Sequence, residues 1–253
     1  MIRLKSKPEI EAIGKAGRIV AGVLALIAER VEPGLTTLDL DRLAEGFIRD
    51  HEGAKPAFKG LYGFPATLCT SLNDEVVHGI PVGSRQLRDG DILGVDVGVA
   101  LEGMFADAAV TVPIGRPSED AQHLLDVTRV SLAAGVREAR AGARVGDVGA
   151  AVQKVVEDAG YSVVRELVGH GVGFAPHEEP QVPNHGRRGH GVTLEEGLVI
   201  AIEPMVNVGR PGIRTLDDGW TVVTADGSLS AHFEHTVAVT RNGPLVLTGR
   251  PGS

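Results

Sequence analysis

The sequence predicts an α+β fold built from two similar halves, each a pair of helices followed by antiparallel strands. The evidence is a set of matching elements at a nearly constant offset. Gly34 and Gly142 each interrupt a helix pair and lie 108 positions apart, and strand-like runs with one acid begin at Gly90 and Gly197, 107 positions apart. Self-similarity at a fixed offset indicates internal duplication. We therefore expect a cleft where the two halves meet.

Helix signals justify the helices of the first half. Ser6, followed by Pro8 and Glu9, is typical of a helix start. Apolar residues then recur at helical spacing as far as Ile27. After the break at 32–37, a second helix is expected over 38–53, ending at Gly53.

The second half repeats this order. Ser118 precedes a third amphipathic helix, which the segment 141–146 interrupts. A fourth helix is expected over 147–160, ending at Gly160. These elements predict a single domain over 1–253, with pseudo-repeats at about 5–112 and 118–248.

Composition excludes several classes of protein. The chain has 253 residues and a formal net charge of -8, without the basic surface that nucleic acid or anionic membrane would attract. One cysteine excludes an internal disulfide. The N-terminus lacks the apolar core of a secretion signal, and no apolar run approaches the ~20 residues of a membrane span. We expect a cytoplasmic protein, monomeric, with no DNA or membrane partner.

Four acids lie inside apolar, strand-like runs: Asp96, Asp107, Glu203 and Glu234. An ionised carboxylate buried alone is costly, so it is normally paired or bound to a metal. The four runs contain no Lys or Arg. Asp107 follows Asp96 by eleven residues, which fits the two arms of a hairpin turning near 101–103. Because two divalent ions would balance four carboxylates, the pattern favours a dinuclear metal site.

The segment 169–180, GHGVGFAPHEEP, places His170 and His177 in backbone that glycine and proline prevent from being helical. His170 is the imidazole candidate for the metal site. Oxygen ligands with one imidazole suit Mn, Fe(II), Co or Zn. The acid pairs 74–75, 178–179 and 195–196 are interpreted as solvated or loop-anchoring.

With these residues in place, the chain resembles the type I methionine aminopeptidases, peptidases of family M24 with the pita-bread fold. The resemblance covers about residues 5–248. It rests on the blocks SLNDEVVHGIP (71–81), DVGVALEGMFAD (96–107), GHGVGFAPHEEPQVPN (169–184), IEPMVN (202–207) and FEHTVAVT (233–240). It implies helices outside a central sheet, with the metal site in the cleft.

The resemblance also implies residue roles. Asp107 and Glu234 would bridge two metal ions, Asp96 would complete the shell of one, and His170 with Glu203 that of the other. A bridging water or hydroxide would be the nucleophile, with Glu203 accepting its proton. His177 would contact the scissile peptide and stabilise the developing oxyanion. His78 would contact the substrate and assist proton movement.

A pocket for the methionine side chain should have soft apolar walls. The positions that the resemblance implies for these walls are Phe58, Leu61, Phe64, Cys69, Pro176 and Trp220. Cys69 is interpreted as a packing residue rather than a nucleophile. Gly98 stands where related chains often carry a hydroxyl residue, and positions 61, 64 and 176 also differ from many bacterial members. The walls are therefore altered while the ligand set is complete.

The function expected from this resemblance is removal of the initiator methionine from nascent proteins whose second residue is small. The partners are nascent polypeptide N-termini, with the ribosome as a further candidate. Three alternatives stay open. The first is an X-Pro peptidase of the same fold, and the second is a catalytically silent binding module for ribosomes or unfolded chains. The third is a mononuclear Fe(II) oxygenase, which would leave three buried acids unexplained.

Overall fold

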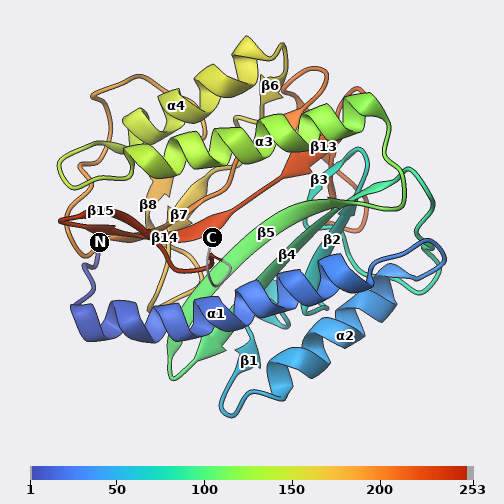
Figure 1. The fold of residues 1–253 in the computed structure, drawn as a ribbon, viewed down its shortest axis with the longest axis horizontal. Helices are drawn as coiled ribbons and strands as arrows, with labels where there is room; N and C mark the ends of the chain where they lie inside the picture. Colours follow the sequence, from blue (N-terminus) through green and yellow to red (C-terminus); the bar gives the residue numbers. More distant parts are fainter. Residues whose placement is uncertain (1, 250–253) are drawn as a thin grey trace.

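The computed structural model describes residues 2–249 and has the predicted α+β architecture, with two helix pairs enclosing the strands (Figure 1). The helices are α1 (Lys7–Arg30), α2 (Thr37–Arg49), α3 (Glu119–Glu138), α4 (Val145–Asp158) and the 3-10 turn η1 (Leu61–Gly63). α2 and α4 begin 108 positions apart, at the predicted offset. The division into repeats at about 5–112 and 118–248, and the single domain over 1–253, stay predictions.

All strand pairs among the described residues are antiparallel and form four sheets. Two of them are large: one has the order β1-β4-β2 with β5 beside β4, and the other has the order β15-β14-β9-β7-β8. The strand bounds are β1 Lys55–Pro56, β2 Leu68–Leu72, β3 Glu75–Val77, β4 Ile92–Leu101, β5 Met104–Pro113, β6 Ser162–Val163, β7 Gly169–Gly171, β8 Glu178–Val182, β9 Val199–Ile202, β10 Met205–Asn207, β11 Ile213–Thr215, β12 Val222–Thr224, β13 Ser230–His232, β14 His235–Thr240 and β15 Gly243–Val246.

Local sequence signals explain where the helices start. Ser6 forms a capping box with Glu9, and Ser118 accepts a bond from the N–H of Ala121, so both predicted starts are confirmed. The predicted start of the fourth helix was two residues late. The helix starts at Val145, and the Asp147 carboxylate accepts a bond from the backbone N–H of Arg144, the residue just before the helix, at 2.8 Å.

The predicted ends of two helices were also wrong. α2 ends at Arg49 rather than at Gly53. The chain then makes a separate turn over 51–54, in which the N–H of Ala54 bonds to the carbonyl of His51 and Gly53 has φ 78°. α4 ends at Asp158, and Gly160 follows in the left-handed region at φ 81°. In both cases the glycine lies in the turn beyond the helix.

The two halves meet along strands β5 and β14. The N–H of Glu234 bonds to the carbonyl of Ala109 at 2.9 Å, and Thr236 Oγ1 donates to the carbonyl of Asp107 at 2.8 Å. One apolar cluster lies between α1, α2 and the β4–β5 hairpin, and another between α3, α4 and strands β9 and β14. The hairpin turn at 101–103 is confirmed. Residues from both halves therefore face a common seam.

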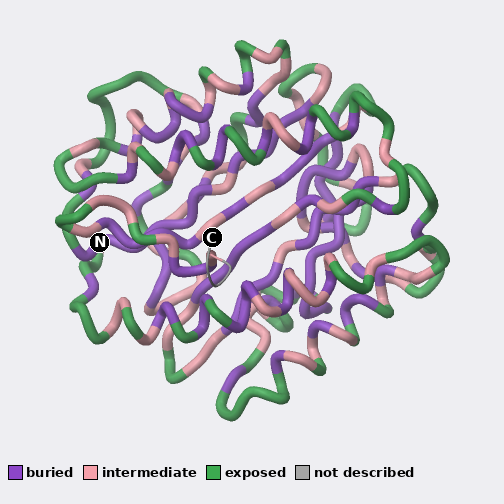
Figure 2. The backbone as a smooth tube through the Cα atoms, viewed as in Figure 1, coloured by how far each residue is buried: buried purple, intermediate pink, exposed green. Residues whose placement is uncertain are grey.

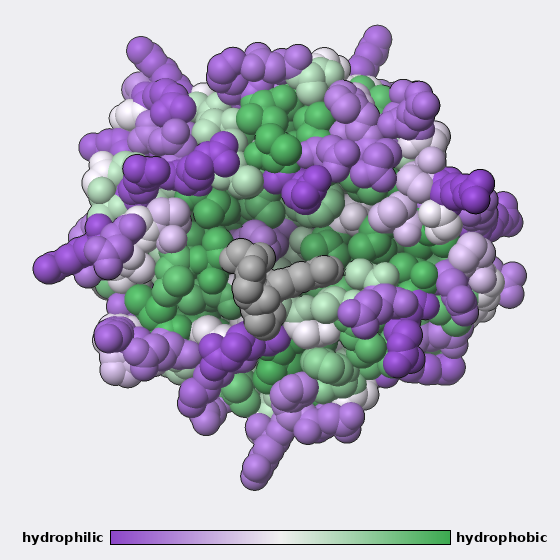
Figure 3. Space-filling model, in the orientation of Figure 1, coloured by the Kyte–Doolittle hydropathy of each residue, from purple (hydrophilic) through white to green (hydrophobic). Residues whose placement is uncertain are grey.

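Burial follows these layers. Figure 2 shows the strands as largely buried, whereas the helices alternate between buried and exposed positions. In Figure 3, hydrophilic side chains project around the outline of the molecule. Within residues 2–249, no helix is both long and apolar enough to cross a membrane.

Candidate metal centre

A cavity of about 630 Å³ opens at the seam, and all four strand carboxylates line it. Asp96 and Asp107 come from the paired strands β4 and β5. Glu203 follows the last residue of β9, and Glu234 precedes the first residue of β14. The fifth predicted ligand, His170 of β7, lines the same cavity. The structure thus gathers all five residues that the sequence singles out.

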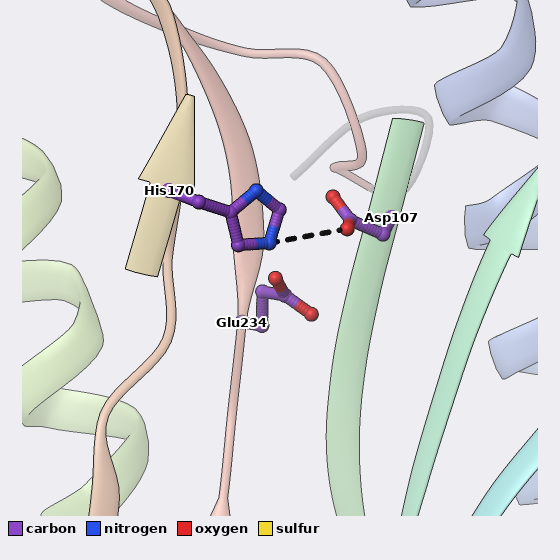
Figure 4. Close-up of side chains that lie close together, drawn as sticks. All are labelled: Asp107, His170 and Glu234. Atoms are coloured by element: carbon purple, nitrogen blue, oxygen red, sulfur yellow. Dashed lines mark ion pairs between the residues drawn. The ribbon is translucent and has the colours of Figure 1, made fainter. Parts of the chain in front are cut away.

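Three of these residues form a tight group. One ligand atom each from Asp107, His170 and Glu234 lies within 4.8 Å of the others, a spacing that can hold a metal ion. Figure 4 shows the three side chains converging from strands β5 and β7 and from the residue just before β14. Asp107 and Glu234 are both 3% exposed, so water contributes little to neutralising them.

Hydrogen bonding orients the imidazole of His170. Its Nδ1 lies 2.9 Å from the carbonyl oxygen of Gly171, an acceptor, so Nδ1 carries the proton. Its Nε2 then presents a lone pair, and it lies 3.5 Å from both Asp107 Oδ2 and Glu203 Oε1. Electron pairs facing each other at this distance call for a cation between them. The hydrogen bond from Nδ1 to the carbonyl of Gly171 is the usual second contact of a metal-binding histidine.

The pKa values of the four carboxyl groups report the same crowding. Burial raises the pKa of Asp107, although His170 and Thr236 oppose the shift. Burial and then the charge of Asp107 raise the pKa of Asp96 well above its usual range. Burial, followed by neighbouring carboxylates, does the same to the pKa of Glu203 and of Glu234. Without a cation, these groups hold protons that ordinary carboxyl groups release.

The protein itself offers these groups little compensation. Among the ion pairs of residues 2–249, none joins a Lys or Arg side chain to any of the four carboxylates. Asp96 Oδ1 is buried and has no hydrogen-bond partner within the described residues. Carboxylate oxygens with one imidazole are ligands of divalent first-row metals. The residues present therefore fit a metal centre.

The other two predicted site histidines also line the cavity. The ring of His177 lies 4.5 Å from that of His170, centroid to centroid, so the chain between the two residues curves back on itself. Burial, then the charges of His170 and His78, lower the pKa of His177 to about 4. Burial lowers the pKa of His78 as well. Both imidazoles are therefore neutral near pH 7 and can exchange protons or donate hydrogen bonds.

Most of the predicted pocket walls gather at one end of the cavity. Phe58, Phe64 and Cys69 belong to a buried apolar cluster, against which Leu61 and Trp220 pack. The rings of Phe64 and Trp220 meet edge to face, 5.1 Å apart. Pro176 does not lie among the residues that line the cavity. Burial raises the pKa of Cys69 well above its usual range, so its thiol stays protonated and a packing role suits it.

Two aromatic side chains of the site escaped the sequence analysis. His232 is buried with its Nε2 3.7 Å from Glu203 Oε2 and without a hydrogen-bond partner in the described residues. Its position two residues before Glu234 was the available signal, because alternate residues of a strand share a face. Tyr62 also lines the cavity and stacks on His177, with the two ring centroids 5.9 Å apart. Nothing in the sequence indicated that contact.

Comparisons with known proteins agree with this geometry. The model of metallopeptidase family M24 matches residues 11–241. The chain is 54% identical to the methionine aminopeptidase of Clostridium perfringens, over 98% of this chain and 99% of that protein. The crystal structure of methionine aminopeptidase from Thermotoga maritima superposes with a TM-score of 0.97 at 44% identity, covering 99% of this chain and all of that one.

A more distant structure shares the fold alone. The prolidase of Pyrococcus horikoshii has a TM-score of 0.79 at 22% identity. The match covers 98% of this chain but 63% of the prolidase. The prolidase is therefore the longer of the two proteins.

Proposed function

The chain belongs to metallopeptidase family M24, and on that premise we propose that it is a methionine aminopeptidase, a hydrolase that removes N-terminal methionine when the second residue is small. Its relatives of that name align over nearly their whole length. The prediction made from the sequence motifs and these comparisons agree. The pita-bread fold agrees as well, since the structural neighbours share it.

The observation that carries the proposal is the convergence of Asp107, His170 and Glu234 at the seam. Their ligand atoms lie within 4.8 Å of one another, and no Lys or Arg of residues 2–249 pairs with them. Glu203, at 3.5 Å from His170 Nε2, and Asp96, with its unpartnered oxygen, would extend this group to five ligands. These five residues would hold two divalent ions, with Asp107 and Glu234 in the tight group at the centre of the set. The identity of the ions among Co, Mn, Fe(II) and Zn is an experimental question.

Divalent ions bound here would polarise the scissile carbonyl and lower the pKa of water towards ~7, so that hydroxide is available at neutral pH. Glu203, which lines the cavity, accepts the proton of the attacking water. A carboxylate with an oxygen free for this proton is needed at that point. Among residues 2–249, no Lys or Arg side chain pairs with Glu203.

His177 donates a hydrogen bond to the scissile peptide, where negative charge develops in the transition state. Loss of one such donor typically lowers kcat by ~100- to 1000-fold. His78 contacts the peptide and passes a proton to the departing amine. Both side chains line the cavity, and both residues lie outside the strands.

Phe58, Leu61, Phe64, Cys69 and Trp220 hold the methionine side chain. Their apolar and aromatic surfaces suit a flexible thioether. The substrate is the N-terminus of a protein chain, and we place the reaction on nascent chains in the cytoplasm. Ribosome docking and a monomeric state remain parts of this proposal for experiment.

Metal dependence on a defined peptide tests the proposal. The purified protein is treated with a chelator and then assayed on Met-Ala-Ser after addition of Mn, Fe(II), Co or Zn, with an Ala-Pro peptide as control. We expect release of methionine only after metal is restored, with two ions per chain by elemental analysis. Metal-independent release, or faster turnover of the Xaa-Pro peptide, would overturn it.

A further inference from the structure

The N-terminal segment that precedes α1 holds a buried ion pair with the loop that carries His177. Lys5 Nζ lies 2.7 Å from Glu178 Oε2, and the Lys5 side chain is completely buried. The two residues are 173 positions apart in sequence. A lysine is seldom buried in this way unless it is paired.

The carboxylate of Glu178 in turn fixes the backbone of the loop. Its other oxygen, Oε1, accepts bonds from the N–H groups of Phe174 and Ala175 at 2.6 and 2.9 Å. Charge-assisted bonds of this kind are stronger than neutral ones. Glu178 thus closes the turn 174–178 on itself, and His177 is the residue just before it.

The segment is anchored on both sides of the ion pair. The N–H of Lys5 bonds to the carbonyl of Gly197 at 2.7 Å, and the guanidinium of Arg3 lies 3.8 Å from the centre of the Phe174 ring. Lys5 also packs against Gly173, where a Cβ would lie 2.7 Å from Lys5 Cε. Gly173 has φ 139°, which turns the chain towards His177. The contacts leave the loop little freedom to move away from the cavity.

We propose that Lys5 is a positioning residue for catalysis, which through Glu178 and the 174–178 turn holds the His177 imidazole against the reacting peptide. This rests on the proposed role of His177. The ring of His177 contacts His170 and Tyr62 but makes no hydrogen bond of its own within the described residues. Its direction is therefore set by the backbone that bears it.

The first test is a mutant cycle on the metal-loaded enzyme with Met-Ala-Ser. Lys5→Met keeps the length of the side chain and removes its charge. We expect kcat to fall at least tenfold while KM stays within threefold. The double variant K5M/H177A should have the kcat of H177A within twofold, because a misplaced imidazole and an absent one are equivalent. A stabilising role alone would give effects that multiply, and that result would overturn the proposal.

A matched control and a second route keep the test decisive. Lys15→Met removes an exposed ion pair of α1 with Glu102 and should leave kcat unchanged. If K5M does not fold, Glu178→Ala removes the other end of the bridge, and the same equivalence with H177A is expected. A normal kcat for H177A would instead refute the proposed role of His177. If K5M has a normal kcat and H177A is slow, the positioning role of Lys5 is refuted and the proposed role of His177 is not.

A spectroscopic readout needs neither metal nor substrate. In the metal-free protein labelled with ¹³C-histidine, the His177 signal is identified by its loss in H177A. K5M should shift or broaden that signal and leave the signal of the exposed His51 in place. An unchanged His177 signal in K5M would show that the ring does not depend on Lys5.

Discussion

Replacing Gly98 by alanine tests how this chain builds its methionine pocket. Gly98 lies on β4, two residues after Asp96 and so on the same face of the strand. An added Cβ would lie 2.6 Å from Cε1 of Phe58 and 3.1 Å from Cβ of Ala57. Carbon atoms normally approach to about 3.5–4.0 Å, so the Phe58 ring would move by about 1 Å into the cavity.

The cost of that movement can be worked out. Overpacking of this kind destabilises by ~1–3 kcal/mol, and the lost backbone freedom of the unfolded chain offsets ~0.4–1 kcal/mol. A net loss of ~1–2 kcal/mol lowers Tm by about 2–8 °C in a chain of this size. Because Phe58 lines the pocket, KM for methionyl peptides should rise about fivefold, equivalent to ~1 kcal/mol.

The assay is calorimetry with steady-state kinetics on G98A, F58L and the double variant. Leucine at 58 vacates the space that the new methyl group needs, so G98A should cost much less in the F58L background. Gly46→Ala on α2 is the control, since nothing lies within 4 Å of its Cβ and alanine favours a helix. Equal costs of G98A in both backgrounds would refute the reasoning.

Three further predictions concern the site. Glu203→Gln should lower kcat at least ~100-fold, because the proton acceptor is lost. The Tm of the metal-free protein should stay the same or rise, because fewer carboxylates crowd together. Unchanged turnover would show that Glu203 is not the proton acceptor. In the metal-free chain the raised pKa of the four carboxyl groups means that the folded state holds more protons than the unfolded state above pH ~4. The free energy of unfolding of the metal-free protein, measured with urea, should therefore fall as pH rises from ~4 towards 7. Adding a divalent ion should release protons, which calorimetry in buffers of different ionisation enthalpy detects. A stability that does not change with pH, together with no proton release, would contradict this prediction. Tyr62→Ala removes an exposed stacking partner of His177, so kcat/KM should fall about two- to fivefold, with Tm within about 1 °C; a large loss of Tm would mean that Tyr62 supports the fold instead.

The carboxylate cluster could be predicted from the sequence because it breaks a strong rule. Charged residues do not normally occur within buried strands, so Asp107 and Glu234 stood out against their apolar neighbours. Their distance from any Lys or Arg pointed to a metal. The nearly constant offset between the two halves, which relates Asp96 to Glu203, then predicted that acids from both halves would meet. Element type and order followed from the same periodic patterns.

The remaining features depend on contacts that sequence spacing does not reveal. Lys5 and Glu178 look like ordinary surface charges until the fold brings them together across 173 positions. Phe58 against Gly98 is a packing match, which becomes visible only from coordinates. The helix ends were missed because a glycine can lie one turn beyond a helix as easily as directly after it, as Gly53 does.

The bonds between β5 and β14 have a consequence for how this molecule becomes active. Asp107 and Glu234 are 127 residues apart in the chain and come from the two segments that meet at the seam. The bonds from Thr236 Oγ1 to the Asp107 carbonyl and from the Glu234 N–H to the Ala109 carbonyl hold these segments together. Neither part of the chain on its own contains all five candidate ligands, so activity should arise only with the late, long-range contacts of folding. Separately expressed fragments, one ending near 112 and the other starting near 118, should each be inactive. The rate at which activity appears after they are mixed would measure the rate at which they associate.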